Sequence, residues 1–307
     1  MRVFVTGATG FIGSAVVREL LDNGHKVLGL ARSDAGADNL AQAGADVLRG
    51  DLRNVETLRT AAAEADGVIH LAFIHDFTNL DVYAFAAQTD EQAIRAMGEA
   101  LAGSDRPFVV TSGFLQVPDG VVATEEHNRD RALERLPRVS EETALEFADQ
   151  GVRVSVVRLP PSVHGEGDRA FVPMFIDSAR DAGVAAYPGD GVNRWPAVHR
   201  DDAAVLYRLA LEQAPAGSRL HAIQDAGVPI REIFEVIGRR LDVPVRSIDP
   251  DEAGTRFGWM AGLLLLDAPA SSAITQDLLG WRPTRPGLIA DLDEGHYFAG
   301  QRSSVTG

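Results

Sequence analysis

Short apolar runs alternate with amphipathic segments of helical period through the first half of the chain. Residues 2–5 form an apolar run as long as a buried strand, residues 14–23 follow with helical period, and residues 26–30 begin a second apolar run. Strands are likewise expected at 46–52, 67–73, 107–113 and 152–159, and helices at 89–102 and 138–150. Repeated strand–helix units predict an α/β fold in which helices cover both faces of a parallel sheet.

Beyond Gly165 this alternation becomes sparse. Helices are expected at 171–182, 203–213, 230–241, 271–279 and 288–297, a short strand at 243–248, and a loop at 186–191. His199, Asp201 and Asp202 could suggest a metal site, but either aspartate is better explained as the N-cap of the helix that follows. We therefore expect no metal.

Three glycines, each separated by two residues, lie between the first strand and the first helix. The segment reads Thr6-Gly7-Ala8-Thr9-Gly10-Phe11-Ile12-Gly13. In this context glycines allow a sharp turn, close approach of the backbone to a pyrophosphate and tight helix packing, while N–H groups of the helix N-terminus face the phosphates. An ordinary tight turn is the alternative. The strand–turn–helix context favours a dinucleotide site, with these contacts: Gly7, Thr9, Gly10, Phe11, Ile12 and Gly13.

The end of the second strand indicates which dinucleotide is bound. An acidic residue there would hold the adenosine ribose and repel a 2′-phosphate, whereas this chain has Arg32, which can pair with that phosphate. We expect NADP(H) to be preferred and NAD(H) to be a second option; a solvated surface arginine is the alternative. Asp51 and Leu52 end the third strand as candidate cofactor contacts, and Asp51 could bind the adenine amino group or only shape the turn.

Small and apolar residues end the fourth expected strand, where a backbone can lie beside the cofactor: Leu71, Ala72 and Phe73. His70, in the middle of that strand, is expected to be packed rather than catalytic. The fifth strand ends in Thr111, a candidate cofactor contact, and Ser112. Ser112 could hydrogen-bond a substrate oxygen, or it could simply finish the strand.

Composition narrows the class of protein. The 307 residues include no cysteine, which excludes disulfides and cysteine–zinc sites and fits a reducing compartment. A net charge of −15 without a basic run argues against nucleic acid or an anionic membrane as a partner. Met1 leads directly into a strand, and the longest apolar stretch, residues 259–266, is far too short to span a bilayer. We expect a soluble, cytoplasmic protein.

Five segments, in this order, resemble the extended short-chain dehydrogenase/reductase family, also called the NAD-dependent epimerase/dehydratase family. They are residues 6–13, 50–52, 68–72, 158–165 (Arg-Leu-Pro-Pro-Ser-Val-His-Gly) and 198–203 (Val-His-Arg-Asp-Asp-Ala). The resemblance implies a Rossmann-type doubly wound parallel sheet with a small C-terminal α/β substrate domain. An NADP(H)-binding domain would comprise 1–165 with about 197–224, and a substrate-binding domain 166–196 with 225–307. It further implies that Pro160, Val163 and His164 lie near the nicotinamide, and it makes a homodimer an option.

The catalytic residues depart from the pattern of this family. Its members use a tyrosine and a lysine one helical turn apart, and the lysine lowers the pKa of the tyrosine. Here Arg138 stands in the place of the tyrosine and Glu142 in that of the lysine, and no tyrosine lies between Tyr83 and Tyr187. Arg138 could hold a cofactor ribose or polarise a carbonyl, and Glu142 could orient it or form only a surface salt bridge. Tyr187 could donate a proton from the substrate domain, or it could pack.

These features give three candidate functions. The first is an NADP(H)-dependent oxidoreductase of the atypical extended type, which moves a hydride to or from a carbonyl or alcohol substrate. Its candidate catalytic residues are Ser112, Arg138, Glu142 and Tyr187. The second is a non-catalytic NADP(H)-binding redox sensor, because both members of the catalytic pair are lost.

The third candidate is a nucleotide-sugar epimerase or dehydratase. It calls for an arginine four residues before His199 to hold a diphosphate, but Trp195 occupies that position and Arg194 lies one residue away. Aromatic residues of the second half suggest instead a pocket for an apolar or aromatic small molecule, although each could equally belong to the core: Phe171, Trp195, Phe257 and Trp259.

Overall fold

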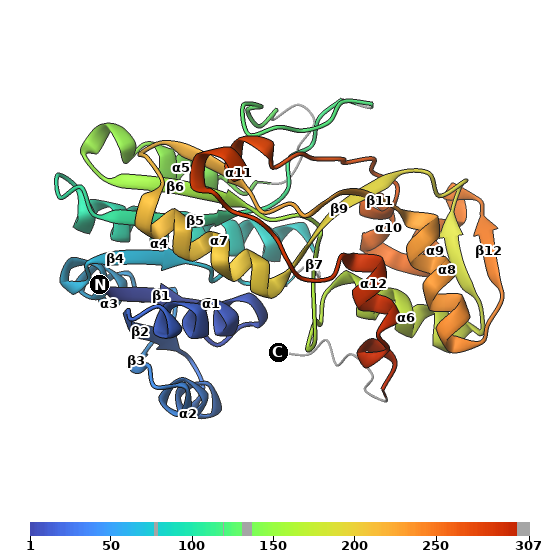
Figure 1. The fold of residues 1–307 in the computed structure, drawn as a ribbon, viewed down its shortest axis with the longest axis horizontal. Helices are drawn as coiled ribbons and strands as arrows, with labels where there is room; N and C mark the ends of the chain where they lie inside the picture. Colours follow the sequence, from blue (N-terminus) through green and yellow to red (C-terminus); the bar gives the residue numbers. More distant parts are fainter. Residues whose placement is uncertain (77–78, 119, 131–136, 300–307) are drawn as a thin grey trace.

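A seven-stranded parallel sheet forms the centre of the larger part of the molecule (Figure 1). The computed structural model describes residues 1–76, 79–118, 120–130 and 137–299. The strands are β1 (Arg2–Thr6), β2 (Lys26–Ala31), β3 (Asp46–Arg49), β4 (Gly67–His70), β5 (Pro107–Ser112), β6 (Arg153–Arg158) and β10 (Ser218–His221). Their order is β10-β6-β5-β4-β1-β2-β3, so the predicted α/β fold is confirmed, and the order reverses between β1 and β4. Ligands of such sheets bind outside the carboxyl ends of the strands at this switch point.

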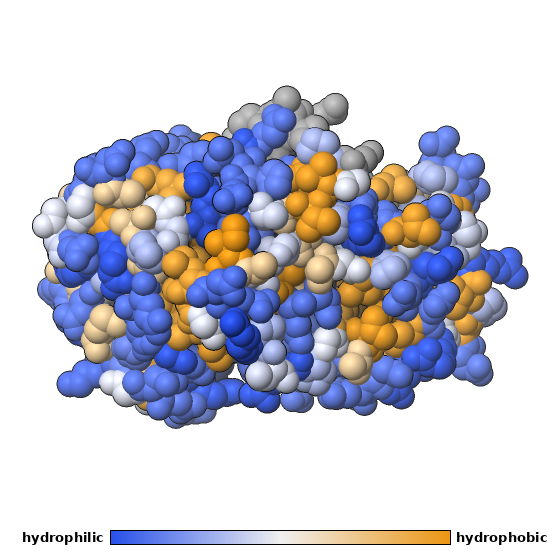
Figure 2. All heavy atoms as spheres, turned by 45° about the horizontal axis from the view of Figure 1, so that its top comes forward, coloured by the Kyte–Doolittle hydropathy of each residue, from blue (hydrophilic) through white to orange (hydrophobic). Residues whose placement is uncertain are grey.

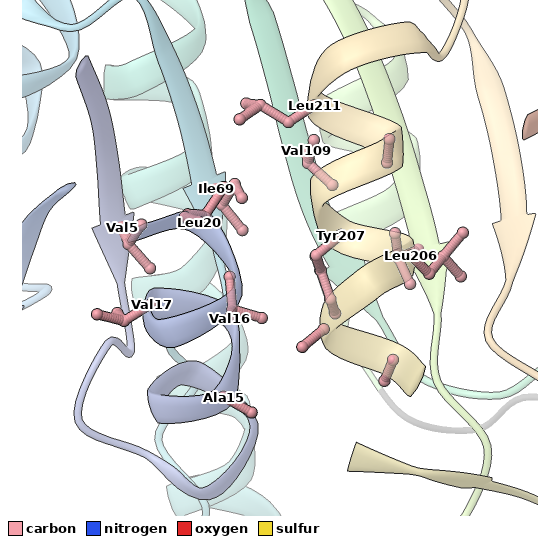
Figure 3. Close-up of a cluster of buried hydrophobic side chains, with 14 of the residues drawn as sticks. Val5, Ala15, Val16, Val17, Leu20, Ile69, Val109, Leu206, Tyr207 and Leu211 are labelled. Carbon is pink, nitrogen blue, oxygen red and sulfur yellow. The ribbon is translucent and has the colours of Figure 1, made fainter. Parts of the chain in front are cut away.

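Helices cover both faces of the large sheet. One face carries α1 (Phe11–Asp22), α2 (Asp34–Ala43), α7 (Arg200–Gln213) and α11 (Ala273–Leu279), and the other carries α3 (Val55–Glu64), α4 (Leu80–Leu101) and α5 (Ser140–Leu145). Figure 3 shows α1 and α7 side by side, with Val16 and Tyr207 between them and Val5 and Val109 on the strands beneath. The apolar runs and helical faces of the sequence therefore pack as one layered core.

The C-terminal part has its own core and two small sheets, at the right of Figure 1. Its strands are β7 (Ser162–His164), β9 (Arg194–His199) and β11 (Asp225–Pro229) in one sheet, and β8 (Ala185–Pro188) and β12 (Val245–Ile248) in the other. The helices are α6 (Phe171–Ala182), α8 (Ile230–Leu241), α9 (Ala253–Phe257), α10 (Ala261–Leu264) and α12 (Leu288–Asp293). Short 3-10 turns are η1 (Ala148–Gln150), η2 (Pro250–Glu252), η3 (Gly258–Met260) and η4 (His296–Phe298). The bounds predicted for α6 and α8 are confirmed.

Several predicted elements were wrong in type or extent, and the predicted helix 288–297 is α12 followed by η4. The expected loop at 186–191 begins as strand β8, which pairs in parallel with β12. The expected helix 138–150 is only α5 followed by η1, so Arg138 precedes the helix. α4 begins nine residues earlier than expected, because the side chain of Asn79 accepts a hydrogen bond from Val82 N–H at 3.0 Å and caps the helix there.

Hydrophilic residues dominate the face shown in Figure 2, and the hydrophobic ones appear as separate patches. This pattern agrees with the net charge of −15. Among the residues that the structure describes, we find no helix with the length and apolar character needed to cross a membrane.

Candidate functional site

The glycine-rich turn after β1 lies tightly against the end of β4. Gly7 has a φ of +67°, and a Cβ built on it would lie 2.7 Å from the backbone nitrogen of Ala72. A Cβ on Gly13 would lie 1.9 Å from the carbonyl oxygen of Gly7. Side chains do not fit at either position, so this turn can keep its shape only with glycine.

The N-terminus of α1 is open beside this turn. Gly10 occupies the N-cap and offers no side chain to the first N–H groups of the helix, and both Thr9 and Gly10 are exposed. Phe11 and Ile12 are half-buried in the first turn. Unsatisfied N–H groups at a helix N-terminus bind phosphate. A dinucleotide therefore fits this end of the sheet on two grounds, the cradle that only glycine can form and the uncapped helix behind it.

Two arginines lie near Asp51, beyond the ends of β2 and β3. The carboxylate of Asp51 accepts hydrogen bonds from the backbone N–H of Arg53 at 2.9 Å and from its Nε at 2.7 Å. The hydrogen bond from Arg53 is the main cause of the lowered pKa of Asp51, and the charge of Arg32 adds to it. Arg32 itself is exposed, and Leu52 is buried in the core. These contacts support the turn-shaping interpretation of Asp51.

Arg138 lies at the carboxyl end of β5, in front of the aromatic ring of Phe73. Its Nε donates a hydrogen bond to Ser140 Oγ at 2.7 Å, and its Nη2 donates to the backbone carbonyl of Thr111 at 3.1 Å. The guanidinium carbon lies 4.1 Å from the centre of the Phe73 ring. The side chain is 20% exposed, so solvent still reaches a guanidinium that several contacts fix in place.

A buried carboxylate stands behind Arg138. Asp90, on α4, is 1% exposed and lies 3.8 Å from Arg138 Nε; it also accepts a hydrogen bond from Ser140 Oγ. His70 completes the group, with Nε2 3.1 Å from Asp90 and Nδ1 2.7 Å from the hydroxyl of Thr6. Burial favours the neutral acid, but the hydrogen bond with His70 and the charge of Arg138 outweigh it and lower the pKa of Asp90. The predicted packing of His70 is thus correct, within a hydrogen-bonded network.

His75 lies beside this arginine and belongs to the same end of the sheet. Its ring packs edge-on against Phe73, with 5.5 Å between the ring centres. Crowding by protein atoms lowers the pKa of His75 although part of its ring still reaches solvent, and the positive charge of Arg138 lowers it further. Both causes act in the same direction and favour the neutral imidazole.

Comparisons with known proteins decide the family. The model of the NAD dependent epimerase/dehydratase family matches residues 3–101. The chain is 49% identical over 300 residues to Uncharacterized protein C2A9.02 of Schizosaccharomyces pombe, covering 97% of this chain and 100% of that protein. It is 30% identical over 259 residues to the 2-alkyl-3-oxoalkanoate reductase of Stenotrophomonas maltophilia, covering 80% and 77%. The protein belongs to the extended short-chain dehydrogenase/reductase family.

Solved structures agree on the fold of this family member. The dTDP-glucose 4,6-dehydratase DesIV from Streptomyces venezuelae, solved with NAD bound, has a TM-score of 0.75 over 96% of each chain at 21% identity. A UDP-glucose 4-epimerase from Thermotoga maritima has a TM-score of 0.74 over 97% of this chain and 98% of that one, also at 21% identity. At this level of identity the likeness establishes the fold alone.

Hydroxyl groups at the end of β5 are already engaged in this family member. Thr111 is buried, and its hydroxyl donates to the His70 carbonyl at 2.8 Å and contacts the Tyr207 hydroxyl at 2.7 Å. Ser112 is 3% exposed, and its hydroxyl accepts a hydrogen bond from Arg129 Nη2 at 2.9 Å. These positions favour the interpretation that Ser112 finishes the strand.

Tyr187 and Glu142, the two other catalytic candidates, lie on β8 and α5. Tyr187 lies on β8, where its ring packs 6.3 Å from that of Phe234, at the end of the C-terminal part far from β5 (Figure 1). The sequence placed Tyr187 in a loop, and its pairing in a strand explains why it packs. Glu142 is half-buried in the first turn of α5, and its role beside Arg138 stays a prediction.

The segment 160–164 is buried where β6 passes into the C-terminal part. Pro160 and Val163 are buried, and the ring of His164 is fully buried with Nδ1 2.8 Å from Asp291 Oδ2 on α12. His164 therefore ties β7 of the three-stranded sheet to α12, and a nicotinamide contact stays a prediction. A carboxylate oxygen of Asp291 also lies within 4.8 Å of a carboxylate oxygen of Glu294 and a ring nitrogen of His296. Glu294 is exposed.

The predicted N-cap of α7 was wrong. His199 occupies the cap and its Nδ1 accepts a hydrogen bond from Asp201 N–H at 3.2 Å. Asp202 is instead buried and accepts the backbone N–H groups of Thr284 and Arg285 at 3.1 and 2.8 Å. Its role, which depends on a segment eighty residues away, left no local sequence signal.

Arg194 is also held by a remote residue. Its backbone N–H, Nε and Nη2 all donate to the carboxylate of Asp267, at 2.7, 3.0 and 2.8 Å. An arginine bound in this way is a poor replacement for the diphosphate-binding arginine of a nucleotide-sugar enzyme. Trp195, at the expected position, is 1% exposed in the C-terminal core.

Two residues that contact this site were not predicted from the sequence. Asp90 lies beside Arg138, and Arg129 binds Ser112. Asp90 had a detectable signal: it interrupts the buried face of α4 between Ala87 and Ala93, and a carboxylate in an apolar stripe must find a partner. Arg129 had none, because it follows a turn and reaches Ser112 and the carbonyl of Gly113 through the fold alone.

Proposed function

We propose that the protein is an NADP(H)-dependent oxidoreductase that transfers a hydride to or from a carbonyl or alcohol substrate, with Arg138 in the position of the missing tyrosine. The observation that carries this proposal is the fixed guanidinium of Arg138 at the carboxyl end of β5, held by Ser140 and the Thr111 carbonyl. This is the end of the sheet at which the glycine cradle lies. The reductase relative from Stenotrophomonas supports a keto substrate.

Several residues would hold the dinucleotide. The cradle of Gly7 and Gly13 and the open N-terminus of α1 suit its pyrophosphate. Arg32 is exposed beyond β2 and suits a 2′-phosphate. The bound nicotinamide would supply or accept the hydride.

Arg138 would act on the substrate oxygen as a fixed cation. When hydride reaches the carbonyl carbon, negative charge develops on the oxygen, and a preorganised guanidinium stabilises that charge. An arginine side chain does not deprotonate in proteins, so Arg138 is unsuited to donate the proton. The proton that completes the alcohol would come from water that reaches the guanidinium, whose side chain is 20% exposed.

Two aromatic residues remain as candidates for the substrate body. Trp195 and Phe257 are 1% and 4% exposed and belong to the core. Phe171 is half-buried and Trp259 is 46% exposed, with 6.0 Å between their rings. This pair supports an apolar group on the substrate.

Turnover of NADPH with a panel of aldehydes and ketones, 2-alkyl-3-oxo acids included, tests the proposal. Arg138→Gln should lower kcat by at least about 100-fold, as expected for loss of an oxyanion-stabilising group, and Arg138→Lys by less. Arg246→Gln, which removes an exposed arginine of β12, is the matched control and should leave kcat unchanged. Equal kcat for Arg138→Gln and the control would refute the role of Arg138. Tight NADPH binding without turnover of any carbonyl would favour the redox sensor.

A further inference from the structure

Arg200 lies beside the N-terminus of α1, although neither the glycine motif nor the Arg138 site includes it. It is the first residue of α7. α1 and α7 lie side by side and run in the same direction, so both begin at the end of the sheet that carries the glycine turn (Figure 3). The guanidinium carbon of Arg200 lies 5.1 Å from the centre of the Phe11 ring, and Phe11 is the first residue of α1.

The local backbone is shaped around this arginine. Gly165 and Gly167 both have positive φ, +135° and +88°. A Cβ on Gly165 would lie 3.4 Å from Arg200 Cγ, and one on Gly167 would lie 3.8 Å from its Nη1. The loop after β7 therefore passes close to the Arg200 side chain and leaves it 21% exposed.

The charge of Arg200 is only partly balanced. Its Nε is 3.5 Å from Asp201 Oδ1, but within the described part of the chain this buried nitrogen has no hydrogen-bond partner. Asp201 is shared, since Arg285 Nη2 lies 3.5 Å from its other oxygen. A half-buried guanidinium that lacks a hydrogen-bond partner is stabilised when an anionic ligand binds it.

We propose that Arg200 is a second cationic contact for the pyrophosphate of the dinucleotide, supplied by α7 beside α1 and the glycine turn. The inference rests on the proposed function, because it needs a dinucleotide bound there. Arg32 would distinguish NADPH from NADH, whereas Arg200 binds the group that both nucleotides share. Arg200 would thus raise the affinity for NADPH and NADH alike without favouring either nucleotide.

Fluorescence titration of the full-length protein with NADPH and with NADH separates these roles. Arg200→Gln should raise Kd for both nucleotides by the same factor, about 10-fold or more, since a hydrogen bond to a charged group is lost. Arg32→Gln should raise Kd for NADPH only. Arg200→Lys, which keeps the charge, should recover part of the loss, and Arg246→Gln should leave both Kd values unchanged.

Each outcome has one meaning. Wild-type protein that binds neither nucleotide refutes the proposed function itself. If the wild-type protein binds the nucleotides and Arg200→Gln binds both with the wild-type Kd values, only the role of Arg200 is overturned. Weaker binding of NADPH alone by Arg200→Gln would overturn the assignment to the pyrophosphate. Circular dichroism melting shows that the variants are folded, and Arg200→Lys supplies the comparison if Arg200→Gln is not.

Discussion

A single methyl group at Gly13 should disturb both the fold and the cofactor site. In Gly13→Ala the new Cβ would lie 1.9 Å from the carbonyl oxygen of Gly7 and 2.8 Å from its carbonyl carbon. To restore even a close contact of about 3 Å, α1 and the turn would have to separate by about 1 Å. Overpacking of this kind costs about 1–3 kcal/mol in the free energy of unfolding. The same displacement moves the phosphate-binding N–H groups, so we expect Kd for NADPH to rise by about 10-fold or more.

Gly262→Ala is the matched control for this substitution. Gly262 lies in α10, is exposed, and a Cβ built on it meets no atom within 4 Å. Alanine there should leave NADPH binding unchanged and stabilise the helix by up to about 1 kcal/mol. Urea unfolding gives the stabilities and fluorescence titration gives the Kd values. If Gly13→Ala matched Gly262→Ala in both measurements, the cradle would not have the close packing that we describe.

Three further substitutions test the packing and electrostatics of other regions. Burial raises the pKa of Asp168 from 3.8 to about 6. Protonated Asp168 therefore stabilises the folded state at low pH, and this stabilisation is lost as the pH rises from about 4 to 6. Asp168→Asn should abolish this loss of stability, which is at most about 3 kcal/mol, in urea unfolding followed against pH. Glu141→Gln leaves buried Arg158 without its counter-charge, hydrogen-bonded at 2.6 and 2.8 Å, and should lower the free energy of unfolding by about 3–5 kcal/mol. Gly98→Ala places a Cβ 2.5 Å from the Phe147 ring and should cost about 1–3 kcal/mol; an unchanged unfolding midpoint in either variant would contradict the packing described.

Sequence patterns predicted those helices and turns whose structure is determined by residues close to them in the sequence. Periodicity predicted the bounds of α6 and α8 to the residue, and glycine spacing located the turn between β1 and α1. The strand β8 was missed because its partner β12 lies sixty residues further along the chain and only pairing makes it a strand. The N-cap of α7 was missed because Asp202 accepts hydrogen bonds from the backbone N–H groups of Thr284 and Arg285 instead of capping its own helix.

The surroundings of Arg138 could not be predicted from its neighbours in the sequence. The groups that fix it come from β5, α4 and the start of α5, which the fold alone brings together. The sequence predicts that the tyrosine–lysine pair is absent and that Arg138 stands in the place of the tyrosine. It could not show that Asp90, about fifty residues earlier, supplies the counter-charge.

This counter-charge explains how the family's site accommodates an arginine. The usual pair uses a neighbouring cation to make a tyrosine acidic. In this chain the cation itself faces the site, and a half-buried guanidinium needs a nearby anion to offset its desolvation. Asp90, 1% exposed and hydrogen-bonded to His70 and Ser140, is that anion. Because guanidinium groups keep their charge in proteins, and because the hydrogen bond with His70 helps to lower the pKa of Asp90, stabilisation of a substrate oxyanion by the proposed pair should persist across the pH range in which a tyrosine acid would lose its proton.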